Sequence, residues 1–224
     1  MTARRIGLLG GTFDPIHCGH LDLATVAQAA IGLTQVVVIP ANVPPHRPKP
    51  LTSSFHRFAM VALAVAGRPG WRASDLELRH EAPSYTATTL RRFRERGYHA
   101  TELFFLIGAD AFRDIGTWRD FPAILDLAHF AVVSRPRHPV TALRDQLPTL
   151  AARMVDAADG VIPEQPSIIL VNGLTADVSS TEIRAAFARG ERVDGEVDPR
   201  VQQHIEHHGL YRFGATDRRS ALGH

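Results

Sequence analysis

Lysine, cysteine and long apolar segments are all scarce in this 224-residue sequence. Lys49 is the only lysine, so the 25 basic side chains are almost all arginine, and with 23 acidic side chains the net charge is +2. A chain so close to neutral has no field strong enough to attract nucleic acid in general, and we expect no nucleic-acid partner. A phosphate site here would use arginine, histidine and backbone amides.

The single cysteine, Cys18, cannot form an internal disulfide, which excludes a disulfide-built secreted scaffold. The apolar run near the N-terminus has about four residues, fewer than the roughly 7 to 15 of a signal peptide, and no other run is long enough to cross a bilayer. We therefore expect a cytoplasmic protein with no membrane partner. With 45% hydrophobic residues, the chain is long enough for one large domain or two small ones.

Short apolar runs alternate with helical periodicity along most of the sequence. We predict strands at "RIGLL", "QVVVIP", "ELFFLIG", "HFAVVS" and "SIILV", and a weaker strand at residues 75–78. The segments between them predict helices at residues 21–31, 55–66, 86–96, 122–127 and 142–154. Continuous apolar strands that alternate with helices are typical of a parallel sheet covered on both faces, so the expected fold class is α/β.

The last part of the chain is helical, with capping residues in "SSTEIRAAFARG" and "DPRVQQHIEHHGLYR" and no strand between them. We therefore predict a core at residues 1–178, a C-terminal helical part at 179–213 and a frayed tail at 214–224. The ligand crevice should form at the carboxyl ends of the strands. A histidine cluster in the last helix resembles a metal site, but on an amphipathic helix we expect an exposed surface: His204, His207 and His208.

The segment "GGTFDPIHCGH" follows the first predicted strand directly. The Gly10-Gly11 turn and the start of the next helix place backbone N–H groups where an anion can bind. His17 and His20 are three residues apart, so both rings can face one crevice. A zinc site is one interpretation, but the pair lacks the spacing and the glutamate of HExxH, and phosphate binding is favoured. Cys18 is better explained as a small apolar side chain than as a nucleophile.

The common fingerprints GxGxxG, GxxxxGK[ST] and GxSxG are absent, which disfavours hydride transfer, P-loop chemistry and a serine hydrolase. "GGTFDPIHCGH" instead resembles the HxGH signature of the nucleotidyltransferase superfamily, in the extended form of the bacterial nicotinate-nucleotide adenylyltransferases. Further matching segments follow in order: "IPANVPPHRP", "APSYTATTL", "FLIGAD", "TWRDFPAIL", "VVSRPRHP", "SSTEIR" and "HIEHHGLYR".

This resemblance implies a doubly wound, Rossmann-like parallel sheet with a small C-terminal helical subdomain. It also implies adenylyl transfer from ATP to nicotinate mononucleotide, giving nicotinate adenine dinucleotide and pyrophosphate in NAD biosynthesis, with Mg²⁺ accompanying ATP and no assigned protein ligand for a metal. A pantetheine-phosphate adenylyltransferase and a non-catalytic nucleotide-binding module are the alternatives. A homo-oligomer is compatible with the sequence.

The resemblance assigns residues to two sides of a site. The ATP side comprises Gly10, Gly11, Thr12, Phe13, His17, His20, Gly108, Ser180 and Arg184, among which His17, His20 and Arg184 are the expected catalytic groups. The mononucleotide side comprises Asn42, His46, Thr86, Asp110, Trp118 and Arg135.

The mononucleotide assignments carry specific expectations. The proline-rich loop that contains Asn42 and His46 is expected to act as a lid, and Trp118 to stack on the pyridine ring. Thr86, at a helix start, could bind a carboxylate through its hydroxyl and adjacent N–H groups, which would favour the acid over the amide. An ordinary helix cap at "SSTEIR" and a tryptophan that merely covers a helix stay open as alternatives. Arg137 stands where the family more often has glycine.

Overall fold

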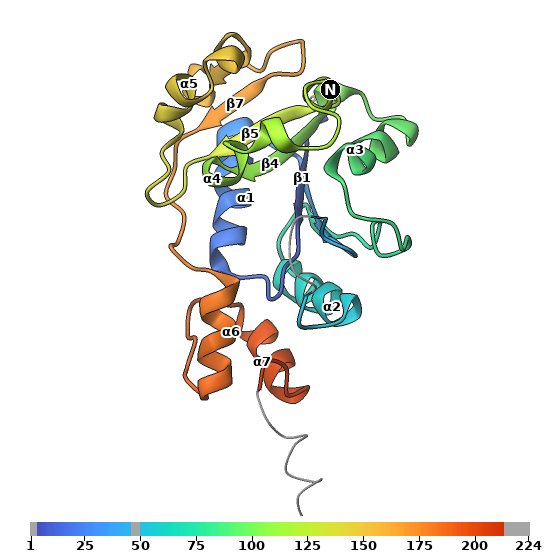
Figure 1. Cartoon of the computed structure of the whole chain (residues 1–224), viewed down its shortest axis with the longest axis vertical. Helices are drawn as coiled ribbons and strands as arrows, with labels where there is room; N and C mark the ends of the chain where they lie inside the picture. Colours follow the sequence, from blue (N-terminus) through green and yellow to red (C-terminus); the bar gives the residue numbers. More distant parts are fainter. Residues whose placement is uncertain (1–3, 46–49, 213–224) are drawn as a thin grey trace, which may run out of the picture.

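The computed structural model describes residues 4–45 and 50–212. Within them, seven strands form one parallel sheet in the order β3-β2-β1-β4-β5-β7-β6 (Figure 1). The strand order reverses between β1 and β4, and this switch point is where ligands bind in open parallel sheets. The strands are β1 (Ile6–Gly11), β2 (Gln35–Pro40), β3 (Trp71–Ala73), β4 (Leu103–Gly108), β5 (His129–Val133), β6 (Met154–Asp156) and β7 (Ile168–Val171).

Helices cover both faces of the sheet, which confirms the predicted fold class. Alternate strand residues point to opposite faces, so Leu9 and Phe104 belong to one core cluster and Leu8 and Phe105 to the other. The first cluster lies under α1 (Cys18–Ile31) and α2 (Ser54–Val65). The second is covered by three helices: α3 (Thr86–Glu95), α4 (Ala109–Phe112) and α5 (Leu143–Gln146).

The C-terminal part consists of α6 (Ser180–Arg189) and α7 (Pro199–His207), which lie beyond the carboxyl end of β1 (Figure 1). Their apolar side chains, Ile183 and Ile205 among them, belong to the same cluster as α1 and α2. The helical part is therefore packed on the core rather than separate from it. No helix in the described part of the chain is both long and apolar enough to span a membrane.

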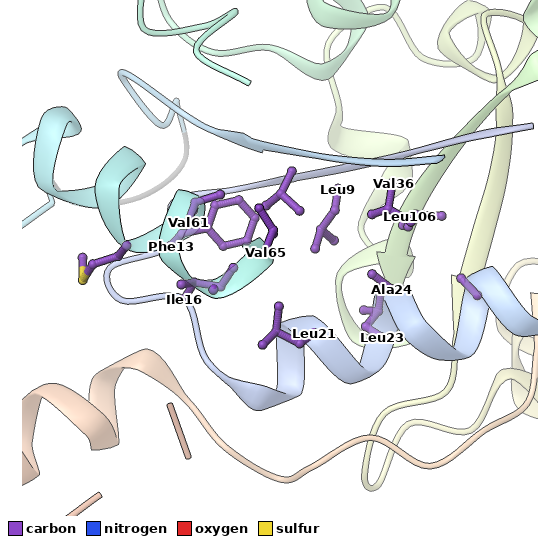
Figure 2. Close-up of a cluster of buried hydrophobic side chains, with 14 of the residues drawn as sticks. Leu9, Phe13, Ile16, Leu21, Leu23, Ala24, Val36, Val61, Val65 and Leu106 are labelled. Atoms are coloured by element: carbon purple, nitrogen blue, oxygen red, sulfur yellow. The ribbon is translucent and has the colours of Figure 1, made fainter. Parts of the chain in front are cut away.

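Apolar side chains anchor the loop between β1 and α1. Figure 2 shows Phe13 and Ile16 of this loop in the cluster that contains Val61 and Val65 of α2. Both loop side chains are about 1% exposed, so their packing in the hydrophobic core fixes the position of the loop backbone. A Cβ on Gly11 would lie 2.8 Å from the Phe13 ring, which explains why glycine is needed there.

Three secondary-structure predictions differ from the structure. Residues 75–78 form a turn in which Leu78 N–H donates to Asp75 O, and the strand lies earlier, at β3. Serine and aspartate in "ASDLEL" favour such a turn over a strand. The helix predicted at 142–154 is broken at Pro148, which has no N–H to donate, into α5, a 3-10 helix and the unpredicted strand β6. The segment 122–127 contains a 3-10 helix, Ala123–Asp126, rather than an α-helix.

Candidate active site

Asp14 organises the loop between β1 and α1. Its buried carboxylate accepts hydrogen bonds from the Thr52 hydroxyl (2.5 Å), the Leu51 N–H (2.8 Å) and the Tyr211 hydroxyl (2.7 Å). Burial first, and then the charge of Asp14, raise the pKa of Tyr211 well above its ordinary value. Asp14 therefore joins the loop to the segment before α2 and to the C-terminal end of the described chain.

Arg57 of α2 fixes the same loop from the other side. Its guanidinium, about 1% exposed, donates to Thr12 O (2.8 Å), Ala41 O (2.5 Å) and Asn42 O (3.3 Å), the carbonyls just past β1 and β2. Arg57 is not part of any motif recognised in the sequence. A signal was present, because Arg57 shares the i, i+3, i+4, i+7 spacing of the buried face of α2 with Met60, Val61 and Ala64. Tyr211 was also missed, and periodicity offers no comparable signal for it.

His17 and His20 lie together at the start of α1, as predicted. Their ring centroids are 3.7 Å apart, and His20 Nδ1 accepts a hydrogen bond from the His17 backbone N–H (3.3 Å). Neutral His20 therefore carries its proton on Nε2. His17 is 4% exposed and its Nδ1 has no partner within the described residues. Burial first, and then the nearby Arg135 charge, lower the pKa of His17 to about 4, so its ring is neutral near pH 7.

Arg135 links β5 to this histidine pair. Its Nη1 donates to Gly19 O (3.2 Å), and a Cβ on Gly19 would lie 3.1 Å from Nη1 and 3.2 Å from His17 Nδ1. A Cβ on Gly108 would lie 2.9 Å from Arg135 Cγ and would also meet Asp110 Oδ1. Arg135 and Asp110 thus lie at the carboxyl end of β4, and Arg135 lies beside the histidine pair, although its sequence assignment grouped it with Thr86 and Trp118.

Ser180 and Arg184 of α6 connect the C-terminal part to the same loop. Ser180 Oγ donates to Pro15 O (2.9 Å), and Arg184 Nη1 donates to Asp14 O (2.7 Å). The helix cap is Ser179, whose side chain accepts from Glu182 N–H. Ser180 and Arg184 are therefore not an ordinary cap and a surface arginine, because both reach the loop that follows β1.

The remaining predicted features of this loop are the helix start, Cys18 and Gly10. The first helical amide of α1, Cys18 N–H, donates to Glu196 O (2.7 Å), so this part of the helix start is used by the C-terminal segment. Cys18 is half-buried, and burial with the neighbouring Asp22 carboxylate raises the pKa of its thiol, which disfavours a thiolate nucleophile. Gly10 is exposed at the end of β1.

The residues predicted for the mononucleotide side lie on loops and at a helix start. Asn42 N–H donates to Ser84 Oγ (2.9 Å) and Asn42 Nδ2 donates to His80 O (2.8 Å), so Asn42 holds the segment that leads into α3. Thr86 is the first residue of that helix. His46 lies outside the described residues.

Trp118 approaches the same edge from the loop after α4. Its ring makes an edge contact with the Phe105 ring of β4 at a centroid distance of 6.0 Å. The Phe105 ring lies next to Gly10 of β1, because it would be the nearest neighbour of a Cβ at that position. The next residue, Arg119, lies over the Tyr85 ring at 4.6 Å, which brings this loop to the N-terminus of α3. Trp118 and Thr86 therefore border the same end of the sheet.

Arg137 occupies a backbone conformation that glycine favours. Its φ is 65°, and it is a central residue of a tight turn in which Arg135 and His138 exchange backbone hydrogen bonds of 3.1 and 2.8 Å. With Pro136 before it, this is the position of a turn that usually takes glycine. An exposed ion pair to Asp177 (2.7 Å) holds the arginine side chain.

The predicted exposed histidine surface on α7 is only partly correct. His207 and His208 are exposed, but His204 is half-buried and its Nε2 lies 3.1 Å from Nδ1 of His56 in α2. His204 thus faces another helix, which the spacing of the histidines alone did not indicate.

Comparisons with known proteins identify the family of this chain. Residues 8–186 match the family model described as cytidylyltransferase-like. A probable nicotinate-nucleotide adenylyltransferase of Roseiflexus sp. is 40% identical over 95% of this chain and 100% of its own length. The nicotinate-nucleotide adenylyltransferase of Salmonella typhimurium is 37% identical over 92% of this chain and 97% of its own.

A solved structure also shares the fold. The Plasmodium falciparum nicotinic acid mononucleotide adenylyltransferase, complexed with NaAD, superposes with a TM-score of 0.70 at 18% identity, over 94% of this chain and 98% of its own. The resemblance seen in the sequence is thereby confirmed, and the chain belongs to the nicotinate-nucleotide adenylyltransferases, within the cytidylyltransferase-like family.

Proposed function

We propose that this protein transfers the adenylyl group of ATP to nicotinate mononucleotide, releasing pyrophosphate. The observation that carries the proposal is the gathering of His17, His20 and Arg135 at the switch point, next to the α6 residues Ser180 and Arg184. Curated relatives 37–40% identical to this chain bear the name of that activity.

In the proposed reaction, a phosphate oxygen of the mononucleotide attacks the α-phosphorus of ATP, and the bond from that phosphorus to the bridging oxygen of the leaving pyrophosphate breaks. No protein nucleophile is needed, so the protein contributes positioning and charge stabilisation. His20 would donate from Nε2–H to a phosphate oxygen. Arg184 has five N–H groups and uses two nitrogens on Asp14 O and Thr181 Oγ1, so donors are left for phosphate.

Mg²⁺ would arrive with ATP and be held mainly by phosphate oxygens and water. The donor set of the site fits this arrangement, because the buried carboxylate of Asp14 is already occupied by three hydrogen bonds. Magnesium commonly binds through substrate phosphates with few protein ligands. It would screen the negative charge of the triphosphate.

We further propose that Thr86 and the first turn of α3 favour the acid mononucleotide over the amide. A helix N-terminus stabilises a carboxylate, and the Thr86 hydroxyl can donate to it. Trp118, which borders the same end of the sheet, would cover the pyridine ring.

The experiment measures pyrophosphate release with nicotinate mononucleotide, the amide mononucleotide and phosphopantetheine, each with ATP or CTP. We expect turnover with ATP and the acid, with the acid preferred in kcat/KM. Turnover with phosphopantetheine alone would reassign the substrate, and no turnover with any pair would refute the enzymatic proposal. Equal kcat/KM for the acid and the amide would refute the role of Thr86 while leaving adenylyl transfer intact.

A further inference from the structure

Three histidines meet where α2 and α7 pack together, outside the proposed active site. His56 lies in the first turn of α2, His204 lies in the last turn of α7, and His208 directly follows that helix. One ring nitrogen from each falls within 4.8 Å of the others. Among residues 4–45 and 50–212, no other group of three histidine, cysteine or acidic side chains comes together in this way.

The three rings lie close together. Their centroids form a nearly equilateral triangle with sides of 5.2 Å (His56 to His204), 4.9 Å (His56 to His208) and 4.4 Å (His204 to His208). His56 Nδ1 and His204 Nε2 share a hydrogen bond of 3.1 Å, which a metal ion bound by both nitrogens would replace. Two nitrogens bound to one tetrahedral zinc ion are separated by about 3.3 Å, given Zn–N bonds of about 2.05 Å. Two of the ligand atoms are therefore already at the spacing that zinc requires.

The chemistry of the cluster suits a transition metal. Neutral imidazole nitrogen is a preferred ligand of Zn²⁺, whereas Mg²⁺ prefers oxygen, so this group would not compete for the magnesium that accompanies ATP.

We propose that His56, His204 and His208 form a zinc site that fastens α7 to α2, with water as the fourth ligand. The chain after α7 reaches Tyr211, whose hydroxyl binds Asp14, and the residue after His56 is Arg57, which binds Thr12 O. The metal would therefore stabilise the packing of the C-terminal part on the loop that follows β1. This proposal does not depend on the identity of the second substrate.

The test uses the full, untagged chain after chelator treatment, with Co²⁺ as a spectroscopic probe and Zn²⁺ as a competitor. We expect one Co²⁺ per chain with the visible absorption of a tetrahedral site, displaced by Zn²⁺. At about 100 times the Kd, Zn²⁺ should raise the Tm by roughly 5–10 °C. His204→Gln and His208→Gln should each weaken binding by at least about 100-fold.

His207→Gln is the matched control, because it removes a histidine of the same helix that lies outside the triangle. It should keep the affinity of the original chain. His208 is exposed, so His208→Gln should fold normally, which circular dichroism without metal will verify. Equal affinities for His207→Gln, His208→Gln and the original chain would overturn the proposal. So would metal binding that is lost on His17→Gln and kept in His204→Gln, because it would place the ion at the loop after β1.

Discussion

The two sides of the proposed active site are held in different ways. On the ATP side, the loop after β1 is fixed by buried groups, with Asp14 and Arg57 each making three hydrogen bonds to other segments. On the mononucleotide side, the half-buried residues Asn42, Thr86 and Trp118 lie on loops and at a helix start that meet through surface contacts. In the proposed function, a preorganised site for charge stabilisation would therefore lie beside a more adaptable site for substrate selection.

The largest effect should come from Asp14→Ala. The change leaves the Thr52 and Tyr211 hydroxyls and the Leu51 N–H without their acceptor, and it removes the negative charge near buried Arg57. We expect a loss of about 4 kcal/mol in the free energy of unfolding, measured by urea denaturation. Asp22→Ala, which removes an acceptor of the Ala176 N–H, should cost only about 1 kcal/mol. Equal losses would mean that the loop is not specially fixed.

His20→Ala should lower kcat by about 10²- to 10³-fold, because it removes one preorganised donor to the phosphate oxygens. Folding should be nearly unchanged, since His20 is only half-buried. Cys18→Ser, two residues away, should leave kcat within a few-fold. A fall in Tm large enough to account for the lost activity would instead indicate a structural histidine.

The pH dependence of stability should reflect His17. Its pKa is about 4 in the folded chain, whereas the ordinary value of 6.5 applies to the unfolded chain. Between these two pH values, the unfolded chain binds a proton that the folded chain does not. Stability should be complete above pH 6.5 and fall, by on the order of 2 kcal/mol from this residue, as the pH decreases to about 4. Denaturation of His17→Gln across this range should show a shallower fall. An identical pH profile would contradict the burial of a neutral ring.

On the mononucleotide side, Thr86→Val should act on binding rather than on stability. Loss of the hydroxyl should raise KM for nicotinate mononucleotide about 10-fold, worth about 1.4 kcal/mol, with KM for ATP unchanged. Thr88→Val, in the same turn of α3, is the matched control and should have little effect on either constant. An equal rise in both KM values would show that the two sides of the site are not separable.

The smallest effect concerns the turn that carries Arg135. Arg137→Gly and Arg137→Ala both remove the ion pair to Asp177, and only glycine fits a φ of 65° without strain. We expect the glycine variant to be more stable than the alanine variant by about 0.5–1 kcal/mol, measured by thermal denaturation. The reverse order would show that the turn relaxes when the side chain is shortened.

The sequence by itself determined most of the strands and the segments that form the loop after β1. Apolar runs predicted the parallel sheet through the strands β1, β2, β4, β5 and β7. The motif "GGTFDPIHCGH" predicted the histidine pair. The motif "SSTEIR" predicted that the start of α6 lies at the loop after β1. These features are local, because hydrophobic periodicity and short motifs each depend on residues close together in the chain.

Only the tertiary structure decided which distant residues meet. Tyr211 reaches Asp14 across 197 positions, and His56 meets His204 across 148, while neither pairing has any local sequence pattern. Arg135 also lies beside the histidine pair rather than with the residues it was grouped with in the sequence. The helix predicted at 142–154 is divided into shorter elements. Side-chain pairing between elements depends on helix packing and sheet order, which a one-dimensional pattern does not encode.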